Sequence, residues 1–233
     1  MSPGYIKDKK NLRPHGMFVL VVLFLLTIPQ TVLADRITGV TATTNMGSGF
    51  GTNLQNTVNG VGLSLLSLTA THAGTVPNNS WVSNVGVLTG QIEFNLGGQF
   101  SVDSFSFWNQ NGGGPGVAGS TGIRNVQVLF STNGVDFTPL TGGPSAFAQV
   151  TGAANRPPQI FSFTAVNATH FRFNVLSNYG DVQTGFAEVG FNGSPVGPGA
   201  IPEPATVLLL GTGLAGVAAK VRKRRKGEPE EAV

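Results

Sequence analysis

The sequence predicts an all-β domain, either a sandwich or a barrel, flanked by two ends that do not belong to it. The 233 residues include 33 glycines, and Asn, Ser and Thr are also abundant, which is typical of short strands joined by tight turns. Short alternations of apolar and polar residues recur along the middle of the chain. No segment there has the Glu-, Lys- and Arg-rich pattern of a soluble helix, so we expect strands without helices.

The clearest strand signals lie in the second half of this domain. Residues 91–96 and 170–175 alternate strictly, and the second run places Phe171, Phe173 and Val175 on one face. The other strands expected there are 102–108, 125–131, 137–140, 160–163 and 186–191, and weaker signals mark 37–42 and 63–71. Regularly spaced short strands of this kind favour a two-layer sandwich or a closed barrel.

Glycines mark the expected turns. Asn133-Gly134 predicts a tight hairpin after 125–131, because both residues accept the positive φ angles that such a turn needs. Gly97-Gly98 is expected to end the strand at 91–96. Residues 112–116 read as a flexible loop, and residues 194–201, rich in Pro and Gly, read as a linker. The folded domain is therefore expected to span 35–193.

The N-terminus has the order of a secretory signal peptide, which we assign to residues 1–34. A basic stretch that contains Lys7, Lys9, Lys10 and Arg13 precedes the apolar run 17–28, and Val32-Leu33-Ala34 follows. Signal peptidase is expected to cut between Ala34 and Asp35. An uncleaved membrane anchor is the alternative, although the apolar run is short for a spanning helix.

The C-terminus carries three signals in order within 202–226. Pro202-Glu203-Pro204 comes first, then the apolar run 205–219, expected to be a transmembrane helix, and then a basic cluster. The cluster consists of Lys220, Arg222, Lys223, Arg224, Arg225 and Lys226. Basic residues after an apolar segment stay in the cytoplasm and stop translocation. Residues 227–233 read as a disordered tail.

This tail resembles the PEP-CTERM sorting signal of Gram-negative bacteria, and the resemblance covers all three parts. It implies that an exosortase, a membrane protease of the transpeptidase type, cuts near the motif, and that the protein accompanies exopolysaccharide production in a biofilm. A plain membrane anchor is the alternative. The protein is then expected to be a transient single-pass intermediate in the inner membrane, and afterwards to lie at the cell surface or outside the cell.

The charge of the domain excludes nucleic acid as a partner. The chain has 14 Lys and Arg residues and a net charge of +3, but ten of these basic residues lie in the two terminal segments. Between 35 and 201 there are four arginines and six acids, so the net charge there is −2. A nucleic-acid-binding domain needs a basic surface to neutralise phosphates. The chain also has no cysteine, which excludes disulfides and thiol chemistry.

Four segments of the domain carry a second resemblance. They are Trp81-Val82-Ser83, the pair 92–98 and 102–108, the hairpin 126–137, and His170 to Phe173 followed by Phe186 to Val189. Over residues 57–193 the chain resembles discoidin or coagulation-factor C domains, which are galactose-binding-like jelly rolls. The resemblance implies a jelly-roll β-sandwich. Two positions depart from the pattern, since Asn133 and Asn59 stand where Asp is usual.

The same resemblance implies two sites. One is a structural Ca²⁺ held by Asn59, the backbone of Ala187, and Glu188; the alternative is that Glu188 is an ordinary acid at a strand edge. The other is a sugar site on the loops at one end of the sandwich. Its candidate residues are Trp108, Asn109, Asn111, Arg124 and Tyr179. Sugars need an aromatic face and fixed polar groups. The alternative for the tryptophans is burial in the core, which we favour for Trp81.

No catalytic pattern is found. No Gly-x-Ser-x-Gly elbow occurs, and the scattered acids offer no pair for glycoside hydrolysis. We therefore expect a non-enzymatic exported protein that binds or organises exopolysaccharide. The alternative is a structural matrix or adhesion protein that contacts other proteins and has no glycan ligand.

Overall fold

The computed structural model describes residues 35–112, 117–152 and 154–197. The expected signal peptide, the sorting segment 202–226 and the tail 227–233 lie outside these residues. No helix in the described part of the chain is long and apolar enough to span a membrane.

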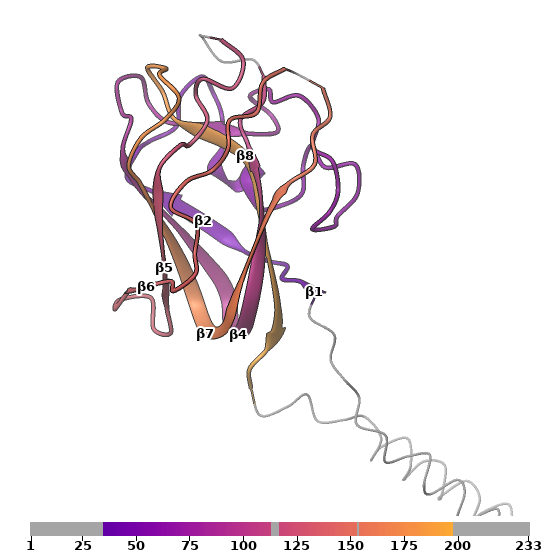
Figure 1. Cartoon of the computed structure of the whole chain (residues 1–233), viewed down its shortest axis with the longest axis vertical. Helices are drawn as coiled ribbons and strands as arrows, with labels where there is room; N and C mark the ends of the chain where they lie inside the picture. Colours follow the sequence, from indigo (N-terminus) through magenta and orange to yellow (C-terminus); the bar gives the residue numbers. More distant parts are fainter. Residues whose placement is uncertain (1–34, 113–116, 153, 198–233) are drawn as a thin grey trace, which may run out of the picture. The chain divides into compact units, whose positions relative to one another are not determined.

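The described residues form an antiparallel β-sandwich, as predicted (Figure 1). Its elements are β1 (Asp35–Arg36), β2 (Thr41–Thr44), the 3-10 turn η1 (Leu54–Thr57), β3 (Trp81–Val82), β4 (Gly90–Asn109), β5 (Val126–Ser131), β6 (Thr138–Pro139), β7 (Gln159–Val175) and β8 (Gly185–Pro195). β8 continues two residues past the expected end of the domain at 193.

Two long strands, β4 and β7, take part in both layers. The first half of β4 pairs with β2 on one side and with the second half of β7 on the other, and β5 and β6 continue this layer. The second half of β4 pairs with the first half of β7 and with β8, to which β1 and β3 add short edges. The two halves of each long strand thus pair with different sets of neighbours.

The expectation that 91–96 and 102–108 form separate strands is wrong. Both lie in the 20-residue strand β4, whose register shifts between Asn95 and Phe100. Gly97 has φ +77° and its N–H donates to Asn95 Oδ1 at 2.8 Å, so the glycine produces a bulge within the strand instead of a turn. The runs 160–163 and 170–175 are likewise one strand, β7.

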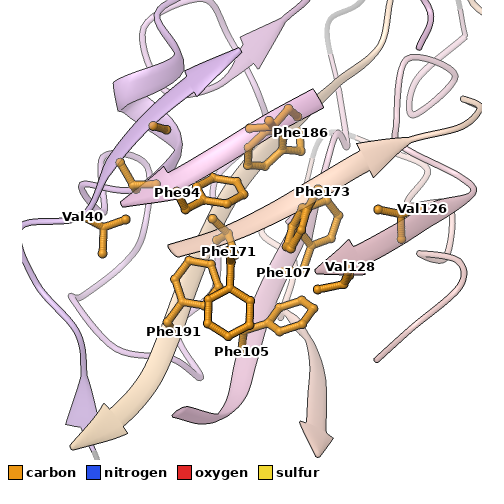
Figure 2. Packing of buried hydrophobic residues seen from close by; sticks show 14 of the residues in the cluster. Val40, Phe94, Phe105, Phe107, Val126, Val128, Phe171, Phe173, Phe186 and Phe191 are labelled. Carbon is orange, nitrogen blue, oxygen red and sulfur yellow. The ribbon is translucent and has the colours of Figure 1, made fainter. Parts of the chain in front are cut away.

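The core is built from phenylalanine side chains of the two layers (Figure 2). Phe171 and Phe173 are fully buried and Val175 is 1% exposed, as the alternation predicted. Phe107 stacks on Phe147 with ring centroids 3.7 Å apart, and Phe171 stacks on Phe191 at 4.8 Å. Burying one such ring contributes about 2 kcal/mol, so this cluster can hold a domain of this size together without disulfides.

Before residue 81 the strand predictions fail in part. The expected strand at 37–42 is replaced by β1 and β2, separated by Gly39 at φ +75°. Residues 63–71 form a loop with one isolated bridge, between Leu63 and His72. Their apolar residues misled the prediction, because Leu65 and Leu66 are more than half exposed instead of facing the core. Figure 1 shows that most long loops gather at one end of the sandwich.

Candidate functional site

Three loops meet around a surface hollow of about 470 Å³. The hollow is lined by Val117, Ser120, Gln149, Tyr179, Gly180, Asp181 and Val182. The loop 176–184 supplies most of this lining, between the ends of β7 and β8. The hollow thus lies among loops, where binding sites of a rigid sandwich are commonly found.

Asn178 fixes the shape of this loop. Its Nδ2 donates to the carbonyl oxygens of Asp181 at 2.8 Å and Gln183 at 2.6 Å, and its Oδ1 accepts from the Gly180 N–H at 2.9 Å. Gly180 has φ +99°, a conformation that glycine adopts without strain. The loop is therefore held in one conformation by its own hydrogen bonds.

Tyr179 is the aromatic side chain of the hollow. It is half-buried, its hydroxyl donates to the Phe147 carbonyl at 2.6 Å, and its N–H donates to the Ser120 carbonyl at 3.1 Å. The exposed Arg124 guanidinium lies 5.7 Å from the ring centroid, within cation–π range. The structure therefore brings together two of the five sugar-site candidates, Arg124 and Tyr179.

Asp181 adds a carboxylate that the sequence analysis did not single out. Its Oδ2 accepts from Ser120 Oγ at 2.5 Å, and its Oδ1 accepts from the Val182 N–H at 2.7 Å. The exposed Gln149 faces the same hollow with an amide. The sequence Asn-Tyr-Gly-Asp, in which turn residues flank an aromatic residue, could have indicated Asp181. Ser120 and Gln149 come from distant segments, and no local sequence pattern marks them.

The other three sugar-site candidates are interior residues, and that expectation is corrected. Trp108 is 2% exposed and donates from Nε1 to the Ala70 carbonyl at 2.9 Å. Asn109 is 2% exposed and donates from Nδ2 to the carbonyls of Ile123 and Ala148. Asn111 is 1% exposed; its Oδ1 accepts from the Thr75 N–H and its Nδ2 donates to the Ala154 carbonyl. None of the three side chains can contact a sugar.

Their role is to hold loops together. Asn109 connects the segment after Gly122 to the segment around Ala148, and these segments lead to Arg124 and Gln149. Trp81 is also fully buried, as we favoured, and donates to the Gly47 carbonyl. An aromatic residue beside a strand thus packs inward here, while the one on a loop stays partly open.

Glu188, one of the three residues expected to hold calcium, forms a buried ion pair with Arg36. The Arg36 side chain is 5% exposed and that of Glu188 is fully buried, and the Arg36 guanidinium donates from Nη2 to Glu188 Oε1. The same Oε1 accepts from the Gly60 N–H at 2.9 Å. Burial raises the pKa of Glu188 to about 7, although the Arg36 charge and these hydrogen bonds act to lower it. Glu188 is therefore a buried acid that bonds to backbone, as in our alternative, and that also pairs with an arginine, which the sequence analysis did not expect.

The other two expected ligands, Asn59 and Ala187, are not part of this ion pair. Asn59 is exposed, and its Oδ1 accepts from the Val61 N–H at 2.9 Å in a local turn. Ala187 is fully buried in β8. Within the described ranges, no group of three or more His, Cys, Asp or Glu side chains is placed to share a metal ion.

His72 is the one buried histidine among the described residues. Its ring nitrogens lie 2.7 Å from the Ala73 carbonyl and 3.1 Å from the Asn79 carbonyl. Burial lowers its pKa, so the neutral ring is favoured. Both nitrogens face backbone carbonyl oxygens, and a neutral ring donates to one of them, which is a structural arrangement.

Comparison of the sequence with protein families identifies the tail. Residues 200–225 match the PEP-CTERM protein-sorting motif. This confirms the first resemblance and implies export followed by exosortase processing at the membrane. A search of curated proteins finds no match.

Solved structures with a similar fold include carbohydrate-binding modules. Module CBM32-1 of a family 31 glycoside hydrolase from Clostridium perfringens is 10% identical, with TM-score 0.48, over 67% of this chain and 96% of that one. The family 32 module of C. perfringens NanJ, solved with galactose, is 14% identical, with TM-score 0.44, over 69% and 99%. A family 89 glycoside hydrolase from C. perfringens is 18% identical, with TM-score 0.46, over 70% of this chain, which spans only 15% of that enzyme.

Strand order and tail together define the class of protein. It is an antiparallel β-sandwich protein with a PEP-CTERM protein-sorting motif, which implies export.

Proposed function

We propose that the sandwich is a non-catalytic carbohydrate-binding domain, and that its site is the hollow beside Tyr179. After export and exosortase processing it would bind or organise exopolysaccharide at the cell surface or outside the cell. The observation that carries this proposal is a hollow with an aromatic ring, a carboxylate and an amide on loops fixed by hydrogen bonds.

The dimensions and chemistry of the hollow suit a short saccharide. Its volume of about 470 Å³ lies within the ~300–1,000 Å³ range of small-molecule sites. The ring of Tyr179 offers an apolar surface for sugar C–H groups. Asp181 retains free lone pairs beyond those used by Ser120 and Val182, so it can accept bonds from sugar hydroxyls, and Gln149 can donate and accept.

The fixed loop also favours affinity. A ligand that orders a mobile loop loses part of its binding free energy to conformational entropy. Here the bonds made by Asn178 and by the Tyr179 hydroxyl already hold the loop in place. Less entropy is therefore lost when a sugar binds.

The composition of the hollow favours binding over cleavage. Glycoside hydrolysis ordinarily needs two carboxyl groups on either side of the scissile bond. Asp181 is the one carboxylate among the described residues that line the hollow. We therefore infer a domain that holds a glycan and leaves it intact.

A glycan array with the purified protein tests this proposal, followed by titration of the strongest ligand. We expect Tyr179→Ala and Asp181→Asn each to weaken binding by about tenfold or more, equivalent to ~1.4 kcal/mol per factor of ten. The matched control is Phe137→Ala, because Phe137 is another ring beneath an arginine: the Arg172 guanidinium lies 3.6 Å from its centroid. An equal loss in the control, or no ligand on the array, would contradict the proposal.

A second candidate function is adhesion through protein contacts, and exposed apolar loops favour it. Phe50 is 62% exposed, Val85 65% and Val182 54%. Backbone bonds from Gly49 to Val82 and from Gly86 to Val182 hold the loops that carry them near one another. If the array shows no glycan, association of the protein with itself or with matrix proteins should be measured, and Phe50→Ser should weaken it.

The tail suggests how the domain reaches its location. We infer that the basic cluster stays in the cytoplasm until the exosortase cuts, since Lys and Arg resist translocation. Neutral replacement of the whole cluster should let a reporter fused after Val233 change compartment, and an unchanged location would contradict this topology. The residues to replace are Lys220, Arg222, Lys223, Arg224, Arg225 and Lys226.

A further inference from the structure

We propose that the guanidinium of Arg36 takes the place of a structural metal ion in this domain. It acts as a built-in cation that ties β1 to the loop after η1 and to β8. The folded sandwich would then be independent of calcium, contrary to what its resemblance to discoidin-like domains implies.

The residues present do not fit a divalent cation. Ca²⁺ requires six to eight oxygen ligands, several of them charged. Glu188 is the one carboxylate at this position, and its Oε1 already accepts from two donors, Arg36 Nη2 and the Gly60 N–H. The side-chain oxygen of Asn59, the second expected ligand, accepts from Val61 N–H in an exposed turn.

Charge gives the same answer. The guanidinium neutralises the Glu188 carboxylate inside a site where both side chains are almost fully buried. A metal ion there would add two positive charges next to one that is already paired. Arg36 Nη1 and Glu188 Oε2 both lack hydrogen-bond partners, so the free acceptor shares the site with a free donor, which repels a metal.

Arg36 makes connections like those of a bound cation. From β1 its Nη2 also approaches the Val58 carbonyl, at 3.3 Å, just after η1. Glu188 contributes β8, and its bond to Gly60 adds the loop that follows. Three segments far apart in the sequence are therefore held at one point by a single side chain.

Gly190 provides the space for this arrangement. A Cβ built on Gly190 would lie 2.7 Å from Leu68 Cδ2, 3.0 Å from Arg36 Nη1 and 3.2 Å from Arg36 Cζ, and the leucine methyl is the one of these groups that can turn away. Gly190 does not have a positive φ, so the backbone conformation does not require glycine at this position. The missing side chain at 190 thus makes room for the guanidinium, and this points to a site shaped around arginine.

The test measures thermal unfolding of the full chain in a mild detergent. In the wild type, we expect the same Tm in millimolar CaCl₂ as in excess chelator. Arg36→Gly should lower Tm by about 10 °C, because it leaves a buried carboxylate without its partner. Millimolar methylguanidinium should restore part of that loss in Arg36→Gly, since it can re-enter the space that the side chain left.

Controls make the rescue specific. Methylguanidinium should not raise the Tm of the wild type, where the space is filled, nor that of Arg36→Gly/Glu188→Gln, where the carboxylate is gone. A calcium-dependent rise in the wild-type Tm would overturn the proposal, and so would a folded Arg36→Gly that methylguanidinium does not rescue. If Arg36→Gly fails to fold, the wild-type comparison between calcium and chelator decides by itself.

Discussion

The substitution Gly190→Ala, which adds one methyl group, should destabilise this domain, although Gly→Ala often stabilises a protein. Where the backbone allows it, Gly→Ala ordinarily stabilises a protein by about 0.4–1 kcal/mol, because it restricts the unfolded chain. At Gly190 the new Cβ would lie 2.7 Å from Leu68 Cδ2 and 3.0 Å from Arg36 Nη1. The leucine methyl can turn away, whereas the guanidinium is held by its bonds to Glu188 and to the Val58 carbonyl, and any shift weakens them.

The size of the effect follows from these two contacts. Overpacking a core ordinarily costs about 1–3 kcal/mol, and separating a buried ion pair costs about 3–5 kcal/mol. Because the guanidinium needs to shift by only a few tenths of an ångström, we expect a net loss of about 3 kcal/mol in the free energy of unfolding for Gly190→Ala. Urea denaturation with an unchanged m-value would measure it.

Two variants separate this explanation from a general effect of alanine. Gly98→Ala is the matched control in β4, since the nearest atom to its new Cβ is Phe100 Cε2 at 3.5 Å, an ordinary contact. It should be neutral or slightly stabilising. In Arg36→Ala/Gly190→Ala the clash with the guanidinium is gone. The free energy of unfolding lost by this double variant should therefore be smaller than the sum of the losses in the two single variants. If Gly190→Ala matches the control, or if the losses add fully, the reasoning is refuted.

Three further predictions concern pH, backbone strain and processing. Because the pKa of Glu188 rises from 4.5 to about 7 on folding, the folded state binds more protons than the unfolded state between these pH values, and the free energy of unfolding should fall by about 3 kcal/mol as pH rises from 4.5 to 7. Urea denaturation at a series of pH values measures this fall, and Glu188→Gln should reduce it. A pH dependence in Glu188→Gln parallel to that of the wild type would contradict the prediction. Phe50 has φ +51° and an exposed ring, so Phe50→Gly should raise the free energy of unfolding by about 1 kcal/mol, and a loss would show that the ring packs. Mass spectrometry of mature protein from its native host should find a start at Asp35 and an end near Pro202, whereas abundant peptides from the basic cluster would speak against exosortase cleavage.

The sheet itself could be predicted well where the strands alternate. Phe171, Phe173 and Val175 face the core as expected, because period-two alternation leaves only one face to bury. A hairpin does form at Asn133-Gly134, with Gly134 at φ +75° between β5 and β6, but it is wider than the tight turn we predicted, because residues 132–137 connect the strands and Asn133 does not have a positive φ. These features depend on neighbours in sequence, so local patterns carry them.

Strand continuity could not be predicted in the same way. Gly97-Gly98 reads as a turn, yet β4 runs through it because β7 pairs with the strand both before and after the bulge. Residues 63–71 read as a strand, yet they form a loop with one isolated bridge. In both cases the deciding partners are remote segments, which a local pattern does not contain.

The candidate sugar site was likewise predicted only in part. The sequence indicated Tyr179 because turn residues mark its loop, and the structure places the predicted Arg124 beside it. Trp108 looked equally suitable as an aromatic, but its indole N–H reaches the Ala70 carbonyl in the interior, 38 residues away in sequence. Asp181 joined the site only through the packing of its loop against Ser120.

By itself, the sequence determined the sorting signal of this protein and its class of fold. The sorting motif at 200–225 is read in linear order, and strand alternation is a local property, so neither requires knowledge of distant contacts. Tertiary structure alone decided the fate of Glu188, whose partner Arg36 is 152 positions away. A buried charge is defined by what surrounds it in space, and only the folded chain places the Arg36 guanidinium, in space left by Gly190, against the expected metal ligand Glu188.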